Sequence, residues 1–238
     1  MQKRYLKSPQ TKNLKNLKNP KNHKKRQMMR RDKMQLKWLE WAKQIQAISQ
    51  AGLAYSKDVY DLERFEQLRT LSVEILNNYT EVETEKIRTL FASEKGYPTP
   101  KVAVRGVVFK DEKILLVKER ADGAWALPGG WADVGLSPKE VAVKEIKEES
   151  GFEVEPIRLL GLIDKKFHNQ PPSPYHEYIV FILCKIVGGE PSEGTETQQV
   201  GFFEENSLPE LSVERNTEKQ IKELFEFLRN PDKEIICD

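Results

Sequence analysis

From residue 34 to residue 77, apolar residues recur at helical spacing. This spacing predicts two successive helices. The second carries an apolar stripe formed by Leu62, Phe65, Leu68, Leu71 and Ile75. We expect this stripe to form part of a core. Two amphipathic helices of this length cannot bury both apolar faces against each other alone. The hairpin is therefore expected to pack on the rest of the chain or on a second subunit.

Beyond residue 100 the pattern changes to short apolar runs separated by turn residues, which is typical of β-strands. The predicted strands cover residues 102–109, 113–117, 154–164, 175–187 and 200–203. Helices are predicted over residues 84–95, 138–150 and 218–229. This order predicts an α/β fold, an α/β/α sandwich around a mixed sheet, preceded by the N-terminal helical hairpin.

The helix predicted over residues 138–150 has clear signals at both ends. Ser137 and Glu140 form a capping-box pattern, and Pro138 occupies the first helical position. Gly151 is a typical helix stop.

Three carboxylates, Glu145, Glu148 and Glu149, fall on one face of this helix, directly after the Gly129–Gly130 turn. Residues three and four apart are neighbours on a helix, so these like charges repel unless a positive charge lies among them. A hard divalent cation, Mg²⁺ or Mn²⁺, suits carboxylate ligands. The alternative is a solvated acidic face that alternates with lysines. The glutamates alone do not decide between the two.

The wider pattern resembles the signature of the Nudix hydrolases, which reads G, five residues, E, seven residues, then R-E-aliphatic-x-E-E-x-G-aliphatic. The matching positions here are Gly130, Glu145, Ile146, Glu148, Glu149, Gly151 and Phe152. Leu136 replaces the first glutamate, and Lys144 replaces the arginine. The resemblance extends over residues 97–203 through further motifs around the glycine turn and the last strand.

The resemblance implies a metal site formed by Glu145, Glu148, Glu149 and the carbonyl of Gly129, with Mg²⁺ as the cofactor and Mn²⁺ as an alternative. The two departures affect residues that brace the loop and the helix. Lys144 can still pair with Glu148 or Glu140, although without the bidentate geometry of arginine.

The resemblance also suggests the catalytic residues, Glu148, Glu149 and Glu196. Glu196, just before the last strand, is expected to serve as a further metal ligand or as the general base. Glu193 in the same loop is the alternative, and a solvated acidic loop is the simpler interpretation of both.

Candidate substrate contacts come from the strands and the turn around this helix. They are Arg105, Lys118, Gly130 and Trp131. Arg105 lies on the first strand, where it could meet a phosphate, and Lys118 lies near the end of the second.

The predicted function is Mg²⁺-dependent hydrolysis of the phosphoanhydride of a nucleoside diphosphate derivative, of the ADP-ribose or CDP-choline type. The products are a nucleoside monophosphate and a phosphorylated moiety. A homodimer formed through the N-terminal helices is expected from the same resemblance. Two alternatives remain: RNA 5′-end or exonuclease processing, and a nucleotide-binding sensor with weak catalysis, suggested by Leu136 and Lys144.

The formal net charge of +2 conceals an uneven distribution along the chain. Residues 1–33 contain 13 basic residues and one acid, which gives +12, and the remainder therefore carries −10. This composition predicts a disordered basic tail over residues 1–33. The apolar spacing predicts a helical region over residues 34–95, and the resemblance implies a Nudix domain over residues 96–238. A nucleic-acid partner for the tail is not favoured, because the tail offers no aromatic platform for bases. Two cysteines and the absence of a long apolar run favour a cytoplasmic protein without a membrane span.

Overall fold

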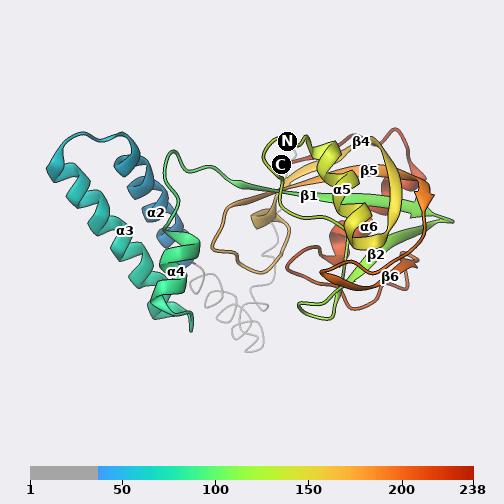
Figure 1. Cartoon of the computed structure of the whole chain (residues 1–238), viewed down its shortest axis with the longest axis horizontal. Helices are drawn as coiled ribbons and strands as arrows, with labels where there is room; N and C mark the ends of the chain where they lie inside the picture. Colours follow the sequence, from blue (N-terminus) through green and yellow to red (C-terminus); the bar gives the residue numbers. More distant parts are fainter. Residues whose placement is uncertain (1–36) are drawn as a thin grey trace, which may run out of the picture. The chain divides into compact units, whose positions relative to one another are not determined.

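The computed structural model describes residues 37–238, shown in Figure 1. Its contacts divide the chain into two compact units, one that ends at Ser93 and one that comprises Glu94–Asp238. The predicted basic tail, residues 1–33, lies outside the described residues.

The first unit is helical. Its helices are α2 (Lys37–Tyr55), α3 (Val59–Tyr79) and α4 (Thr84–Phe91). Helix α3 begins at Asp58, whose side chain accepts hydrogen bonds from the backbone N–H groups of Tyr60 and Asp61. Helices α2 and α3 pack side by side as a hairpin (Figure 1), which agrees with the predicted pair of helices.

The interior of this hairpin is more polar than the sequence pattern suggested. Ser72, Val73 and Leu76 are the buried residues of α3, whereas Leu71, expected in the apolar stripe, is exposed. Ser72 donates a hydrogen bond to the side chain of buried Gln46 on α2, with 3.2 Å between the two oxygens. The expected stripe is therefore only partly buried: Leu62, Phe65 and Ile75 are half-buried, and Ile75 packs against the core of this unit.

The second unit is built on a seven-stranded sheet. Its strands are β1 (Lys101–Lys110), β2 (Lys113–Glu119), β3 (Trp125–Ala126), β4 (Phe152–Asp164), β5 (Glu177–Gly189), β6 (Thr197–Phe203) and β7 (Ile236–Cys237). The strand order is β3-β2-β1-β5-β4-β7, and β6 pairs with β2. Strand β1 is parallel to β5 and β4 is parallel to β7, whereas the other pairs are antiparallel, so the sheet is mixed as predicted.

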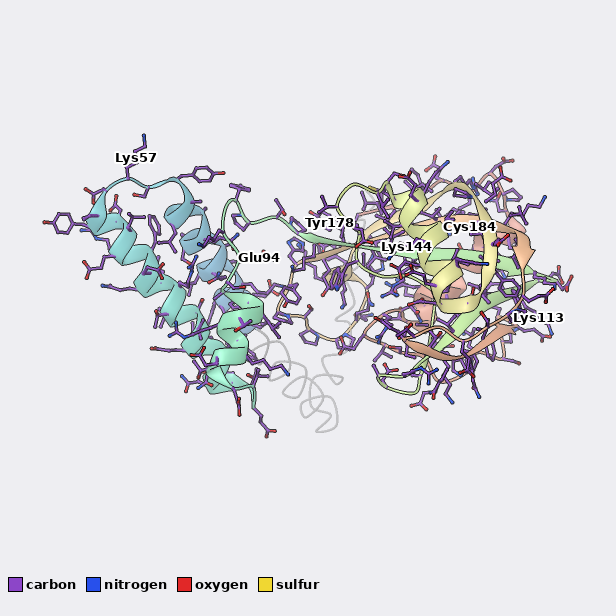
Figure 2. The ribbon with its side chains drawn as sticks, in the orientation of Figure 1. Lys57, Glu94, Lys113, Lys144, Tyr178 and Cys184 are labelled. Atoms are coloured by element: carbon purple, nitrogen blue, oxygen red, sulfur yellow. The ribbon has the colours of Figure 1, made fainter. Side chains whose placement is uncertain are left out.

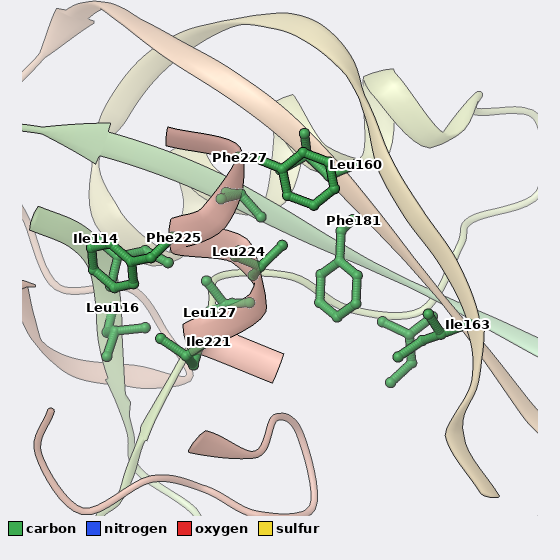
Figure 3. Close-up of a cluster of buried hydrophobic side chains, with 12 residues drawn as sticks. Ile114, Leu116, Leu127, Leu160, Ile163, Phe181, Ile221, Leu224, Phe225 and Phe227 are labelled. Carbon is green, nitrogen blue, oxygen red and sulfur yellow. The ribbon is translucent and has the colours of Figure 1, made fainter. Parts of the chain in front are cut away.

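Helices α5 (Pro138–Ser150) and α6 (Glu218–Arg229) cover opposite faces of this sheet. Val141 and Ile146 of α5 belong to one buried cluster, and Leu224 and Phe225 of α6 belong to the other, which is drawn in Figure 3. The predicted α/β/α sandwich is confirmed, and both helices have the predicted bounds. Strands β3 and β7 were not predicted, because two residues are too few to show a pattern.

The two cysteines differ in their surroundings. Cys184 on β5 (Figure 2) is 3% exposed, and burial raises the pKa of its thiol to about 12. Cys237 is exposed. Within residues 37–238, none of the helices combines the length and the apolar character that crossing a membrane requires.

Helix α5 owes its fixed bounds to local interactions at its two ends. Ser137 accepts a hydrogen bond from the N–H of Glu140, and the Glu140 carboxylate accepts one from the N–H of Ser137. At the other end Gly151 has a φ of 78°, a left-handed conformation that favours glycine. These caps fix where the glutamates of α5 fall relative to the sheet.

Removing the N-terminal cap should destabilise the catalytic unit. We expect Ser137→Ala to cost about 1 kcal/mol and to lower the melting temperature by about 2–4 °C. Thermal unfolding followed by circular dichroism measures the shift. Ser207→Ala, at an exposed turn serine, is the control and should leave the melting temperature unchanged. Equal effects of the two substitutions would contradict the role of the cap.

Candidate active site

Backbone hydrogen bonds hold the turn at Gly129–Gly130 against strand β1. The N–H groups of Val104 and Gly106 donate to the carbonyls of Gly130 and Pro128, each at 2.8 Å. Gly129 between them has a φ of 149°, and a Cβ there would lie 2.1 Å from the Val104 carbonyl oxygen. Only glycine fits this close approach of the two backbones.

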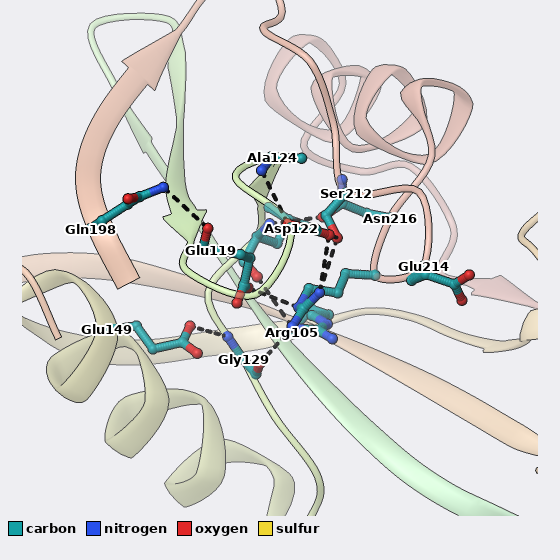
Figure 4. Close-up of polar contacts among 12 residues, drawn as sticks. Arg105, Glu119, Asp122, Ala124, Gly129, Glu149, Gln198, Ser212, Glu214 and Asn216 are labelled. Carbon is teal, nitrogen blue, oxygen red and sulfur yellow. Dashed lines mark hydrogen bonds and ion pairs between the residues drawn. The ribbon is translucent and has the colours of Figure 1, made fainter. Parts of the chain in front are cut away.

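The Gly129 peptide connects the strand to helix α5 (Figure 4). Its N–H donates to a carboxylate oxygen of Glu149 at 2.9 Å. Its carbonyl oxygen accepts a hydrogen bond from the guanidinium of Arg105, which also donates to the Leu127 carbonyl at 3.4 Å. The backbone of the turn thus lies between a carboxylate and a guanidinium.

The three glutamates of α5 differ in exposure. Glu149 is buried, the Glu145 side chain is 13% exposed and the Glu148 side chain is 57% exposed. A Cβ added to Gly130 would lie within 3.0–3.1 Å of the Glu145 carboxyl atoms, so this carboxylate lies directly against the turn. The glutamates therefore extend from the buried turn to the solvent along one side of the helix.

Burial raises the pKa of Glu149 to about 8. The hydrogen bond from Gly129 and the positive charge of Arg105 both lower this pKa, but burial has the larger effect. The carboxylates of Glu119 and Glu145 raise it further. Glu149 is thus in a site that favours its neutral form unless a positive charge arrives.

The ammonium of Lys144 lies among three carboxylates at the outer part of the site. Its Nζ is 3.2 Å from Asp133 Oδ2, 3.3 Å from Glu145 Oε1 and 3.3 Å from Glu148 Oε2. Of the two partners predicted for Lys144, Glu148 is therefore present, whereas Glu140 takes part in the capping box. The contact with Asp133, on the loop after the glycine turn, was not foreseen.

A buried polar network lies beside Glu149 and Arg105 (Figure 4). Glu119, at the end of β2, is 2% exposed and pairs with the Nε of Arg215 at 2.9 Å. Burial raises the pKa of Glu119. Asp122 accepts a hydrogen bond from Ser212 at 2.6 Å. Sequence reasoning missed this network, because its members come from segments far apart in the chain.

The acidic loop of residues 190–196 is fastened to the end of α5. Thr197 donates a hydrogen bond to the Glu149 carbonyl at 2.7 Å and accepts one from the N–H of Gly194 at 2.8 Å. The backbone carbonyl of Glu196 accepts a hydrogen bond from the N–H of Arg120 at 2.8 Å, which places Glu196 beside the end of β2. The Glu193 carboxylate forms an exposed ion pair with Arg120 at 3.2 Å.

The predicted substrate contacts occupy different environments. Arg105 is 8% exposed and donates to two backbone carbonyls through one terminal nitrogen, whereas its buried Nε has no hydrogen-bond partner in the part of the chain that the structure describes. Trp131 is 49% exposed, with its ring edge-on to Tyr175 at 6.5 Å between ring centroids. Lys118 lies within the sheet, opposite Trp125 on β3 and Gln199 on β6 in the register of the paired strands.

A cavity of about 360 Å³ lies beside the acidic loop. It is lined by Trp125, Pro191, Ser192, Glu193, Gln199 and Val200. The loop that holds Glu196 thus borders an open space as well as helix α5.

The oxygen atoms around the Gly129–Gly130 turn are suitable ligands for a hard divalent cation. Glu145, Glu148, Glu149 and the Gly129 carbonyl are all oxygen ligands, which Mg²⁺ and Mn²⁺ prefer. A carbonyl oxygen has two lone pairs, so Gly129 can accept from Arg105 and still bind a cation. Among the described residues no three acidic, histidine or cysteine side chains are already arranged as a ligand set. The ammonium of Lys144 lies between two of the carboxylates instead.

Comparison with protein-family models gives two matches. Residues 99–225 match the model described as a NUDIX domain. Residues 36–91 match the model described as a UDP-X-like, N-terminal oligomerisation domain.

Known proteins match along most of the chain. A Bacillus subtilis protein, YjhB, whose name proposes ADP-ribose pyrophosphatase activity, is 54% identical over 87% of this chain and 99% of its own length. A crystal structure of a UDP-X diphosphatase is 34% identical, with a TM-score of 0.54, over 86% of this chain and 99% of that one. An ADP-ribose pyrophosphatase structure from Streptococcus suis is 43% identical, with a TM-score of 0.55, over 59% of this chain and 100% of that one.

Replacing Glu149 by glutamine should stabilise the metal-free protein most strongly at high pH. The pKa of Glu149 is raised from 4.5 to about 8, so its burial costs stability increasingly as the pH rises between these values. Glutamine keeps an acceptor for the Gly129 N–H but carries no charge. With a chelator present, Glu149→Gln should raise the melting temperature at pH 9, and the gain should shrink towards pH 5.

Melting curves at several pH values check this, with Glu148→Gln as the exposed control. A gain for Glu149→Gln that does not change with pH would show that the buried carboxylate is not the cause.

Proposed function

The chain belongs to the Nudix hydrolase family and is a pyrophosphohydrolase, and we propose that it hydrolyses ADP-ribose or a similar nucleoside diphosphate derivative with Mg²⁺. The observation that carries this proposal is the group of three glutamates that α5 presents beside the Gly129–Gly130 turn. Carboxylates in this arrangement can hold a cation against a pyrophosphate, which carries negative charge of its own.

Two observations support the choice of substrate. The Bacillus subtilis and Streptococcus suis relatives are both named for ADP-ribose, and this makes ADP-ribose the first candidate. The UDP-X diphosphatase covers most of the chain, and the model matched by the helical unit is described as UDP-X-like. A uridine diphosphate derivative is therefore the second candidate. CDP-choline, expected from the sequence, has the support of neither observation.

The cation would be held by Glu145, Glu148, Glu149 and the Gly129 carbonyl. When bound, it supplies Lewis-acid polarisation of the phosphoanhydride and activation of the attacking water. The turn fixes the direction of the Gly129 carbonyl, and Arg105 neutralises part of the charge next to Glu149. Attack of water at one phosphorus breaks the P–O–P bridge and gives a nucleoside monophosphate and a phosphorylated second moiety.

A general base must take a proton from that water. We assign this role to Glu196, because its loop is held to the Glu149 carbonyl through Thr197 and because its own carbonyl accepts a hydrogen bond from the N–H of Arg120. Glu193 is less suitable, since its carboxylate already pairs with Arg120. Glu196 is exposed and can therefore exchange its proton with solvent.

A substrate panel tests the proposal. Release of nucleoside monophosphate would be measured with ADP-ribose, a UDP-sugar, CDP-choline and a 5′-triphosphate RNA, each with Mg²⁺ or with chelator. We expect Mg²⁺-dependent turnover of ADP-ribose, absent in Glu149→Gln. Tight nucleotide binding without turnover of any compound would instead identify a sensor, and preference for the RNA would identify a processing enzyme.

Glu196→Gln should lower kcat by roughly a hundredfold or more while KM changes little, because general base catalysis contributes about 10²–10⁴ in rate. Steady-state kinetics on the best substrate of the panel measure both constants. Glu193→Gln is the matched control from the same loop. A loss of less than about tenfold for Glu196→Gln would remove this residue from the base assignment.

We also propose that the chain forms a homodimer through its helical unit. Trp41, Ile48 and Tyr55 recur every seven residues on α2 and are 57%, 57% and 67% exposed. A row of large apolar side chains open to water is typical of a protein interface. The matching model, described as an oligomerisation domain, agrees with this assignment.

Ile48→Glu should convert the dimer to a monomer, because it places a charge in the centre of that row. Light scattering after size-exclusion chromatography measures the mass. Val187→Glu is the matched control, since Val187 is 62% exposed on the catalytic unit. A dimer that survives Ile48→Glu but not Val187→Glu would place the interface elsewhere.

A further inference from the structure

The position of Lys144 has a consequence for metal binding. Two of its three carboxylate partners, Glu145 and Glu148, belong to the proposed metal site, and the third, Asp133, does not. We propose that Lys144 is an internal cation that competes with the divalent metal for Glu145 and Glu148, and that Asp133 is the alternative partner that receives it. The pair Asp133–Lys144 then sets the metal affinity of the site. This inference rests on the metal site of the proposed function but not on the identity of the substrate.

The geometry of the helix alone does not explain the position of the ammonium. Lys144 and Glu145 are adjacent in sequence, and adjacent residues point away from each other on a helix. Lys144 precedes Glu148 by four residues, which is the less favourable order for such a pair. Asp133 is the one partner outside the helix, and its contact at 3.2 Å is as short as either of the others. Asp133 therefore attracts the ammonium from a position outside the proposed metal site.

The charges explain why the lysine can change partners. One ammonium among three carboxylates leaves a net charge of −2, which a single divalent cation would balance. A cation bound by Glu145 and Glu148 would repel Lys144. Because the ammonium already contacts Asp133, it can keep this partner after it loses the other two, without a movement of the backbone.

This arrangement also accounts for the departures from the family signature. Leu136 stands where the signature has a glutamate, and an apolar side chain offers nothing to a cation. Asp133 supplies a carboxylate three residues earlier, and Lys144 in place of arginine has a flexible side chain with one compact charge, which changes partners readily.

A double-mutant cycle on Mn²⁺ binding tests the inference. Calorimetry would measure the Kd of Mn²⁺ for the full chain without any substrate. Asp133→Asn leaves Lys144 with only the glutamates, so binding should weaken about tenfold. Lys144→Met removes the competitor, and binding should be unchanged or tighter. The double variant Asp133→Asn/Lys144→Met should have a Kd within about twofold of that of Lys144→Met. Once the lysine is absent, the loss of Asp133 should no longer affect metal binding.

Lys147→Met is the matched control, because Lys147 lies on the same helix but pairs with Glu153 at 2.9 Å. It should leave the Kd of Mn²⁺ within about twofold of the wild type. If Asp133→Asn weakens binding equally with and without Lys144, the effect is simple loss of negative charge and the inference fails. Coupling between Asp133 and Lys144 without hydrolysis of any substrate would keep the inference and reject the proposed function. Hydrolysis without coupling would do the reverse.

Discussion

The site depends on the backbone of one residue, Gly129, which is held from both sides. Its N–H donates to Glu149 on α5, and its carbonyl accepts from Arg105 on β1. The Val104 carbonyl lies so close that any side chain at this position would clash with it. Helix, turn and central strand are thus joined at a single point. The position of every glutamate on α5 relative to the turn follows from this contact.

A second constraint is electrostatic, because the fold brings acids together from separate elements. Glu119 from β2 and Glu149 from α5 both have raised pKa values caused mainly by burial, and the charge of Glu119 raises the pKa of Glu149 further. Arg105 and Arg215 are the positive charges that make this crowding tolerable. The inner part of the site therefore contains Arg105 and Arg215, and the outer part contains Lys144, the lysine that we propose changes partners. This division of positive charges suits a reaction in which the negative charge of phosphate groups arrives with the substrate and leaves with the products.

The sequence was most informative where structure is local. The bounds of α5 could be predicted because Ser137, Pro138 and Gly151 act within a few residues, and the glutamate spacing follows from helical geometry. The pairing of Lys144 with Glu148 was predicted, but its contact with Asp133 was missed because Asp133 lies on a loop whose path depends on the sheet. The polar interior of the helical unit was missed for a similar reason, since apolar spacing does not report a hydrogen bond between two helices.

That interior also determines how α2 and α3 align. The hydrogen bond from Ser72 to Gln46 lies within the hairpin and forms only when these two residues face each other. If one helix slid along the other by a turn, the buried Gln46 side chain would lose this partner at a cost of about 1–3 kcal/mol, whereas Ser72 would keep its hydrogen bond to the Arg69 carbonyl of its own helix. An interior of leucines alone would permit several such alignments with similar energies. The hydrogen bond between Ser72 and Gln46 therefore favours one alignment of α2 along α3 over the others. This specificity comes at some expense in stability.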